Sequence, residues 1–306
     1  MRGSEPGGRE ASWYEATARQ RLSALVDPGT YREFMGPECR EQSPHLAEFD
    51  LPRAFDDGML IGRARLHGQP VLIAAQEGQF MGGAIGEVHG AKLTGLLRGA
   101  RDAGGPDVLI LFDTGGVRLQ EANAGELAIA EIMRAVIEAR VAGVKVIGLI
   151  GGRAGCFGGG ALIAACCSAL AISEQGRIGV SGPEVIETNR GVEEFDARDR
   201  PLVWRTLGGK HRRLLGSAEL FVGASTRCFR EAARLLLERA PGLTRDILLA
   251  ENQRLSARLR LLGNAPDAVE IWRMLGVTEP AEVAQMDAEA FIGLAHGVRK
   301  PRYDAR

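Results

Sequence analysis

The sequence predicts an α/β fold built on a parallel sheet, and three observations carry this prediction. Short, uniformly apolar segments such as 107–112 and 145–150 have the composition of strands buried on both faces. A glycine-rich loop follows each of them, and each loop leads into a segment with helical spacing of its apolar residues. A repeated order of strand, loop and helix is typical of parallel strands joined by right-handed crossovers.

The N-terminal part of the chain is expected to differ from this repeat. Residues 1–12 are rich in Gly, Ser, Pro and charge, and we expect them to be disordered. A helix is expected over 13–25, where apolar and small residues recur with helical spacing before the breaker Asp27-Pro28-Gly29. A second, short helix is expected over 30–36.

A hairpin is expected to open the sheet. Segments 58–66 and 69–76 have strand composition, and His67-Gly68 between them is a turn signal. Helices and strands alternate over the following segments. The expected helices cover 90–103, 120–142 and 161–168. The expected strands cover 107–112, 145–150, 170–173 and 177–180.

The C-terminal third is expected to be helical. It is rich in Leu, Arg and Ala, and its three predicted helices cover 217–240, 244–262 and 265–275. No linker divides the chain, so residues 13–306 are expected to form one domain with a helical region from about 217. The basic run 210–213 is expected on a solvated face, with contact to an acidic protein as the alternative.

Composition excludes several classes of protein. A net charge of −1, without a long basic run, argues against nucleic acid as a partner. The sequence holds no apolar run of about 18 residues, as a membrane span requires. The 5 cysteines form no Cys-x-x-Cys pair, which disfavours a zinc ribbon or a disulfide framework. Reduced thiols indicate a cytoplasmic protein.

Three glycine loops suit one kind of chemistry. They contain Gly82-Gly83 with Gly86, Gly115-Gly116, and Gly158-Gly159-Gly160. A loop that opens a helix presents backbone N–H groups without helical partners, and the helix dipole adds positive potential there. Two such loops together can form an oxyanion hole. The alternative is that these glycines only allow close packing; a phosphate-binding P-loop is disfavoured because its Gly-Lys-Ser/Thr motif is missing.

Specific motifs link these loops to a known family. Thr-Gly-Gly-Val-Arg-Leu-Gln-Glu-Ala at 114–122, Gly-Gly-Ala-Ile-Gly at 82–86 and Gly-Pro-Glu-Val-Ile-Glu at 182–187 resemble segments of biotin-dependent carboxyltransferase subunits, in the same order. Ser-Pro-His-Leu at 43–46 and Cys-Phe-Gly-Gly at 156–159 are similar to the β subunits of malonate decarboxylases. The four-cysteine zinc motif typical of the acetyl-CoA carboxylase β subunit is missing, which favours the malonate branch.

The resemblance implies a fold and an assembly. The fold is that of the ClpP/crotonase group, a spiral of ββα units, here with helical N- and C-terminal additions. The implied substrate is malonyl thioester on an acyl carrier protein subunit, whose arm is phosphoribosyl-dephospho-coenzyme A or coenzyme A. The further implied partners are a γ subunit and an acyl carrier protein transferase subunit, and no cofactor or metal is expected to bind this chain directly.

The resemblance also implies an activity. The expected reaction is decarboxylation of the malonyl thioester to an acetyl thioester, with the enolate held by backbone N–H groups. Two alternatives stay open. The subunit can instead pass the carboxyl group to biotin, or it can be a non-catalytic scaffold for its partner.

Candidate site residues follow from the loops and the family. The expected oxyanion donors are the amides of Gly115, Gly116, Gly158 and Gly159. The segment with Gly82, Gly83 and Gly86 is expected to shape the groove for the thioester arm.

Two side chains complete the expected substrate site. Arg118 either binds a carboxylate or phosphate of the arm, or ties its loop to Glu121. His89 either protonates the enolate carbon or is a hydrogen-bonded packing residue.

Overall fold

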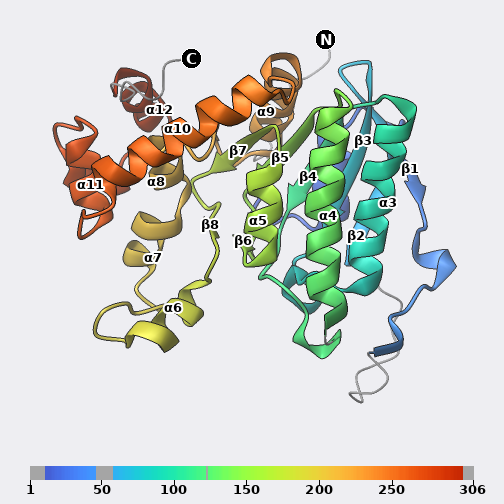
Figure 1. The fold of residues 1–306 in the computed structure, drawn as a ribbon, viewed down its shortest axis with the longest axis horizontal. Helices are drawn as coiled ribbons and strands as arrows, with labels where there is room; N and C mark the ends of the chain where they lie inside the picture. The colour runs from blue at the N-terminus through green and yellow to red at the C-terminus, as the bar shows by residue number, and fades with distance from the viewer. Residues whose placement is uncertain (1–10, 46–57, 122, 299–306) are drawn as a thin grey trace, which may run out of the picture.

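The computed structural model describes residues 11–45, 58–121 and 123–298. Its main sheet has seven strands in the order β1-β2-β3-β4-β5-β7-β9, and β6 pairs with β8 in a small second sheet (Figure 1). The strands are β1 (Arg32–Phe34), β2 (Met59–Leu66), β3 (Gln69–Gln76), β4 (Val108–Phe112), β5 (Val146–Ile150), β6 (Cys156–Phe157), β7 (Ala169–Ser173), β8 (Ile178–Gly179) and β9 (Leu220–Val222).

Helices follow most of these strands. The α-helices are α1 (Ala18–Leu25), α3 (Glu87–Ala103), α4 (Asn123–Val141), α5 (Gly159–Cys166), α6 (Pro183–Arg190), α7 (Arg200–Leu207), α8 (Gly209–Leu214), α9 (Thr226–Arg239), α10 (Arg245–Leu262), α11 (Ala268–Met274) and α12 (Ala288–Gly297). Short 3₁₀ turns are η1 (Pro37–Cys39), η2 (Met81–Gly83), η3 (Leu119–Glu121) and η4 (Pro280–Ala284).

The sheet is antiparallel at one side and parallel over the rest. Strands β1, β2 and β3 pair antiparallel, and β3, β4, β5, β7 and β9 pair parallel. Each unit in the middle of the chain has a main-sheet strand, a short pairing in the second layer and a helix: β5, β6 and α5 form one, and β7, β8 and α6 the next. The predicted α/β class, hairpin and parallel repeat are confirmed.

The main sheet has helices on both faces. Helices α3, α4 and α5 lie side by side over one face (Figure 1), where Ile110 and Phe112 of β4 belong to their core. Leu109 and Leu111 point to the other face, into a core that α1 and α9 complete. Because successive strand residues alternate between faces, the uniformly apolar β4 fits a strand covered on both sides.

Segments far apart in sequence meet beneath the sheet. The Trp13 ring stacks on Phe229 of α9 with a centroid distance of 4.0 Å. The Thr226 N–H donates to the Ala11 carbonyl, 3.0 Å away. Residues 1–10, which hold most of the segment expected to be disordered, lie outside the described residues.

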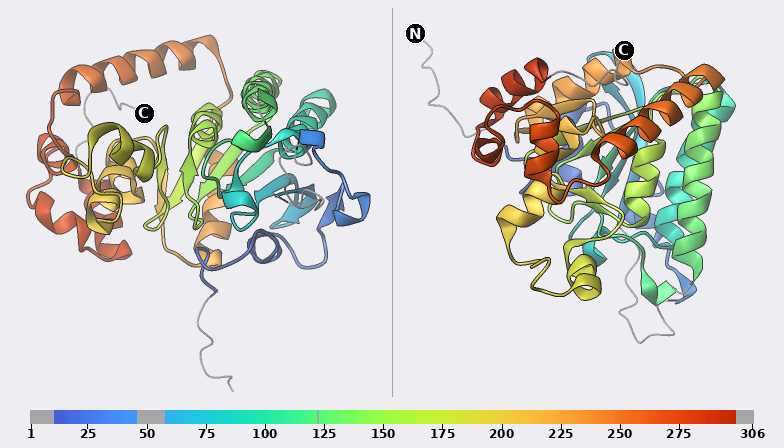
Figure 2. Two further views of the ribbon diagram at one scale, coloured as in Figure 1. Left: turned by 90° about the horizontal axis from the view of Figure 1, so that it is seen from below. Right: turned by 60° about the vertical axis from the view of Figure 1, so that its left-hand side comes forward.

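The C-terminal helices have a core of their own, formed around Trp272 and Phe291. Helix α10 runs along the outside of the molecule between α9 and α11 (Figure 2). Leu262 is the only buried residue of α10, so most of its leucines are accessible. The helical character expected of this region is found, and helices α6, α7 and α8 come before it.

Three local predictions were wrong. The segment 30–36 holds strand β1 instead of a helix, because Arg32–Phe34 pairs with β2. The predicted helix 217–240 contains strand β9, which pairs with β7 before α9 begins. In both cases pairing with a distant strand overrides a short local pattern.

The third error concerns the basic run 210–213, whose first two side chains are buried. Lys210 Nζ donates to the Ala284 carbonyl at 3.1 Å, and His211 Nδ1 accepts from Trp272 Nε1 at 3.2 Å. Burial lowers the pKa of His211 to about 3, so this imidazole is neutral in the folded chain. These residues anchor α8 to the C-terminal helices instead of lining a solvated face.

Candidate active site

The three glycine loops meet at the carboxyl edge of the parallel strands. The loop after β4 lies between the other two: the Gly115 N–H donates to the Gly82 carbonyl at 2.9 Å, and the Phe157 N–H donates to the Thr114 carbonyl at 2.9 Å. A Cβ placed on Gly158 would lie 3.2 Å from the Gly116 Cα. The loops come together because parallel strands end at one edge of a sheet, and an oxyanion hole built from two loops requires such a meeting.

Most of the predicted oxyanion donors are already engaged. Besides the Gly115 amide, the Gly116 N–H donates to Thr114 Oγ1 at 3.1 Å, and the Gly158 N–H donates to the Gly179 carbonyl at 3.2 Å. The expectation that all four amides are free for a substrate is therefore wrong for these three. Their bonds hold the loops to one another.

The start of α5 is different. Gly159 and Gly160 are its first two residues, and their amides have no hydrogen-bond partner among the described residues. Gly159 is partly accessible, so its N–H can reach a ligand oxygen. The first N–H groups of a helix have no partner within it, and the helix dipole favours negative charge there. Gly159 thus retains the geometry expected of an oxyanion donor.

The glycines of the loop after β3 have separate roles. A Cβ on Gly83 would lie 1.8 Å from the Asp113 carbonyl oxygen, and one on Gly86 would lie 2.3 Å from Glu121 Oε2. Both glycines are buried and allow close packing, so they do not shape a groove. Gly82 is exposed and lines a pocket, as expected for a residue beside a ligand.

Arg118 ties two loops together. Its Nη1 donates to Glu121 Oε1 at 2.9 Å, both side chains are 0% exposed, and its Nε donates to the Ala84 carbonyl at 2.8 Å. Glu121 Oε2 also accepts the Glu87 N–H at 2.5 Å, at the start of α3. Of the two interpretations of Arg118, this geometry agrees with the tie to Glu121, since a buried guanidinium cannot meet a thioester arm.

His89 is fully buried in α3. Its Nε2 lies 3.2 Å from Nε2 of Gln76, at the end of β3, and neither side chain is more than 1% exposed. A group so enclosed has no access to an enolate carbon at the loop edge. The geometry agrees with the packing interpretation of His89.

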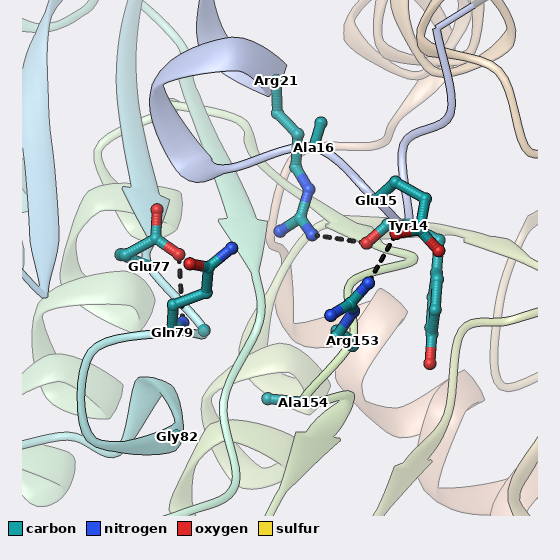
Figure 3. A pocket seen from close by; sticks show the side chains of 10 residues that line it. Tyr14, Glu15, Ala16, Arg21, Glu77, Gln79, Gly82, Arg153 and Ala154 are labelled. Carbon is teal, nitrogen blue, oxygen red and sulfur yellow. Dashed lines mark hydrogen bonds and ion pairs between the residues drawn. The ribbon is translucent and has the colours of Figure 1, made fainter.

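A pocket of about 270 Å³ opens beside the loops after β3 and β5 (Figure 3). It combines two arginines and two glutamates with backbone from both loops. Its lining residues are Tyr14, Glu15, Ala16, Arg21, Glu77, Gly78, Gln79, Gly82, Arg153 and Ala154.

Sequence reasoning missed a buried ion pair at this edge. Arg21 of α1 donates from Nη1 to Asp113 Oδ2 at 2.7 Å, and the two side chains are 2% and 4% exposed. Asp113 stands between β4 and its glycine loop. The available signal was Arg21 itself, which shares the buried face of α1 with Ala18 and Leu25.

Cys156 lies shortly before Gly158-Gly159-Gly160 and is not a nucleophile. Its thiol is buried, and burial raises its pKa well above the usual value, so the thiolate is not formed near neutral pH. All five cysteines are free thiols. Within the described ranges no cluster of three or more His, Cys, Asp or Glu side chains could hold a metal ion.

Comparison with known proteins identifies the family of the chain. Residues 12–202 match the carboxyl transferase domain model. The chain belongs to the carboxyl transferase family. It is 37% identical to the malonyl-S-ACP:biotin-protein carboxyltransferase MADC of Malonomonas rubra, over 94% of this chain and 96% of that protein.

Solved structures agree with this membership. One chain of a Pseudomonas malonate decarboxylase hetero-tetramer superposes with a TM-score of 0.79 and 38% identity, covering 87% of this chain and 98% of that chain. A chain of the Pseudomonas MdcD-MdcE hetero-dimer superposes with a TM-score of 0.66 and 35% identity, covering 83% of this chain and 97% of that chain. The transcarboxylase 12S structure superposes with a TM-score of 0.61 and 26% identity, covering 74% of this chain and 41% of that chain. The resemblance to malonate decarboxylase subunits and the crotonase-like fold are confirmed, and the chain is an enzyme of the carboxyltransferase family.

The part of the chain that the structure describes contains no helix long and apolar enough to cross a membrane.

Proposed function

We propose that this chain is the β subunit of a cytoplasmic malonate decarboxylase. With a γ subunit it converts malonyl thioester on an acyl carrier protein into acetyl thioester, and a transferase subunit supplies the malonyl group. The observation that carries this proposal is the open Gly159 amide at the start of α5, in a chain that resembles malonate decarboxylase subunits over most of its length. The arm that carries the thioester is phosphoribosyl-dephospho-coenzyme A or coenzyme A.

The chemistry needs little from side chains. The bond between the carboxylate and the α carbon breaks, its electron pair spreads into the thioester oxygen as an enolate, and CO2 leaves. The carbon is then protonated. The Gly159 N–H, with Gly160 beside it and the dipole of α5 behind, stabilises the oxygen as its charge grows.

Exposed apolar side chains on the elements that follow the glycine loops support a partner. Leu119 follows the Gly115-Gly116 loop and is 78% exposed, and Leu162 lies one turn after Gly159 and is 40% exposed. Val180 and Val185, next to β8 and on α6, are also exposed. Large apolar side chains left exposed in one subunit are candidates for contact with another. In this proposal the γ subunit covers these side chains and excludes water from the enolate.

The test removes one N–H group and little else. A Cβ on Gly159 would lie 2.0 Å from Ile129 Cδ1, so the comparison is made in an Ile129→Ala background. Proline is tolerated at the first residue of a helix and lacks the N–H group. Gly159→Pro should lower kcat for malonyl-coenzyme A about 100- to 1,000-fold relative to Gly159→Ala in that background.

The chain is tested together with its γ subunit, and CO2 release is measured. Equal kcat for the proline and alanine variants would exclude Gly159 as the donor. Wild-type complex without CO2 release above background would exclude the decarboxylase.

A second function is favoured by the relative from Malonomonas rubra, whose name describes transfer to a biotin protein. In that case this subunit passes the carboxyl group to biotin on another subunit. Inhibition of the activity in a cell extract by avidin would identify this variant, and the decarboxylase proposed above is insensitive to avidin.

A further inference from the structure

The side chain of Asp113 joins two loops of the site to the N-terminal helix. Its Oδ2 accepts from Arg21 Nη1 at 2.7 Å, and its Oδ1 accepts the Ala154 N–H at 2.6 Å. Ala154 belongs to the loop that connects β5 to β6 and leads to Gly158. The carboxylate therefore fixes the position of the loop that precedes α5.

The backbone of Asp113 contacts the end of β3 and the glycine loop that follows it. Its N–H donates to Gln76 Oε1 at 3.0 Å, and its carbonyl oxygen packs against Gly83. A Cβ on Gly78 would lie 2.5 Å from Asp113 Oδ2, and one on Gly152 would lie 2.2 Å from Asp113 Cγ. Two glycines thus make room for this one carboxylate.

Arg21 is itself fixed from behind. Its Nε donates to the Trp13 carbonyl at 2.8 Å, and Trp13 stacks on Phe229. The guanidinium therefore connects the packed N-terminal segment to the loops through side-chain hydrogen bonds in a fixed geometry.

We infer that Arg21 and Asp113 are positioning residues, which set the spacing of the three glycine loops so that the Gly159 amide meets the substrate oxygen. This inference rests on the proposed function, because it concerns the same site. Neither residue is assigned contact with the reacting atoms. Their effect is on the transition state, where a displacement of about 1 Å can cost about 100-fold in rate.

Asp113→Asn is the first test, in the complex with the γ subunit. The amide keeps the shape of the side chain but leaves Arg21 buried without a counter-charge. We expect kcat for malonyl-coenzyme A to fall about 100-fold while KM is unchanged, as for an interaction expressed only in the transition state.

Asp27→Asn is the matched control. Asp27 also accepts from an arginine, Arg230 at 2.5 Å, and from two backbone N–H groups, those of His67 and Gly68. Asp27 follows α1, and its carboxylate bonds to the turn between β2 and β3, at the edge of the sheet opposite the glycine loops. We expect this variant to keep the wild-type kcat.

Chemical rescue is the second test. Arg21→Ala leaves a space that joins the open pocket lined by Arg21, Gly78 and Gly82. Guanidinium ion, at concentrations well below those that unfold proteins, should enter it, pair with Asp113 and restore part of kcat. Sodium chloride of equal ionic strength should not. This arm also decides the matter if Asp113→Asn fails to fold.

Hydrogen exchange separates this inference from the proposed function. In Asp113→Asn we expect faster amide exchange in 113–117 and 151–160, and unchanged exchange elsewhere, whether or not the complex turns over. An active wild type with an Asp113→Asn variant of equal kcat would overturn the inference and leave the proposed function intact. An inactive wild type would overturn the proposed function, and unchanged exchange in both loops would then overturn the inference too.

Discussion

Two glycine loops at the same sheet edge use their backbone in opposite ways. In the loop after β4, the Gly115 and Gly116 amides donate to neighbouring loops or to Thr114. In the loop that opens α5, the Gly159 and Gly160 amides have no partner among the described residues. Both loops are rich in glycine, so composition alone does not show which loop has its amides bonded within the chain and which leaves them open to a ligand. The hydrogen bonds do.

The loop after β4, whose amides are bonded within the chain, supports the loop that opens α5. The Arg118–Glu121 pair holds the loops after β3 and β4 together, and β4's loop in turn packs against Gly158. An oxyanion donor must be fixed before the charge develops, because reorganisation during the reaction costs free energy. The rigidity of the loop after β4 is therefore part of the function of the loop that opens α5.

Among the variants that test this difference between the loops, Arg118→Met should destabilise the protein most. It leaves Glu121 buried without its guanidinium, and we expect the free energy of unfolding to fall by about 3–5 kcal/mol. Denaturant unfolding measures it. The control is Arg134→Met, because Arg134 pairs with Glu131 at an exposed surface, where solvent screens the pair, and its loss should change the free energy of unfolding far less. Equal losses in both variants would show that the loop after β4 needs no buried pair.

A smaller loss is expected from Gly158→Ala. Gly158 has φ of +55°, and a Cβ there would lie 3.2 Å from the Gly116 Cα, so alanine is strained. We expect about 1–3 kcal/mol of destabilisation and a lower kcat, because Gly159 moves with its neighbour. Thermal unfolding and steady-state kinetics measure the two effects. A variant as stable and active as the wild type would contradict the strained contact.

The smallest effect is expected from Gly115→Ala. Gly115 is exposed, and its nearest contact to an added Cβ is the Gly82 carbonyl oxygen at 3.4 Å. Its amide is already engaged, so we expect stability within about 0.5 kcal/mol and an unchanged kcat. A large loss of kcat with an intact fold would mean that the added methyl group obstructs the substrate at Gly115, and the assignment of this loop to a structural role would fail.

The sequence predicted the framework of the fold and the places of the glycine loops after its strands. Uniformly apolar β4 and β5 and the His67-Gly68 turn are strong local signals, because burial on both faces and turn geometry restrict residue choice. Strands β1 and β9 have three residues each, and their pairing partners lie far away in the chain. Such short segments carry no period long enough to read.

The site was only partly predictable for the same reason. Gly159 follows from its place at a helix start, which is local information. The bond between Gly115 and Gly82, or between Arg21 and Asp113, joins residues far apart in sequence. The spacing of residues within one segment does not show which backbone amide donates to a distant residue and which has no partner within the described chain.

The stacking of Trp13 on Phe229 has a consequence for how this protein can be divided. The carboxyl transferase match ends at residue 202, but the core beneath the main sheet is completed by α9, which begins at Thr226. A truncation at residue 202 would remove β9 and the helix that covers β5 and β7, and it would release the segment that carries Arg21. The residues that the family model matches therefore do not include every element that completes this core.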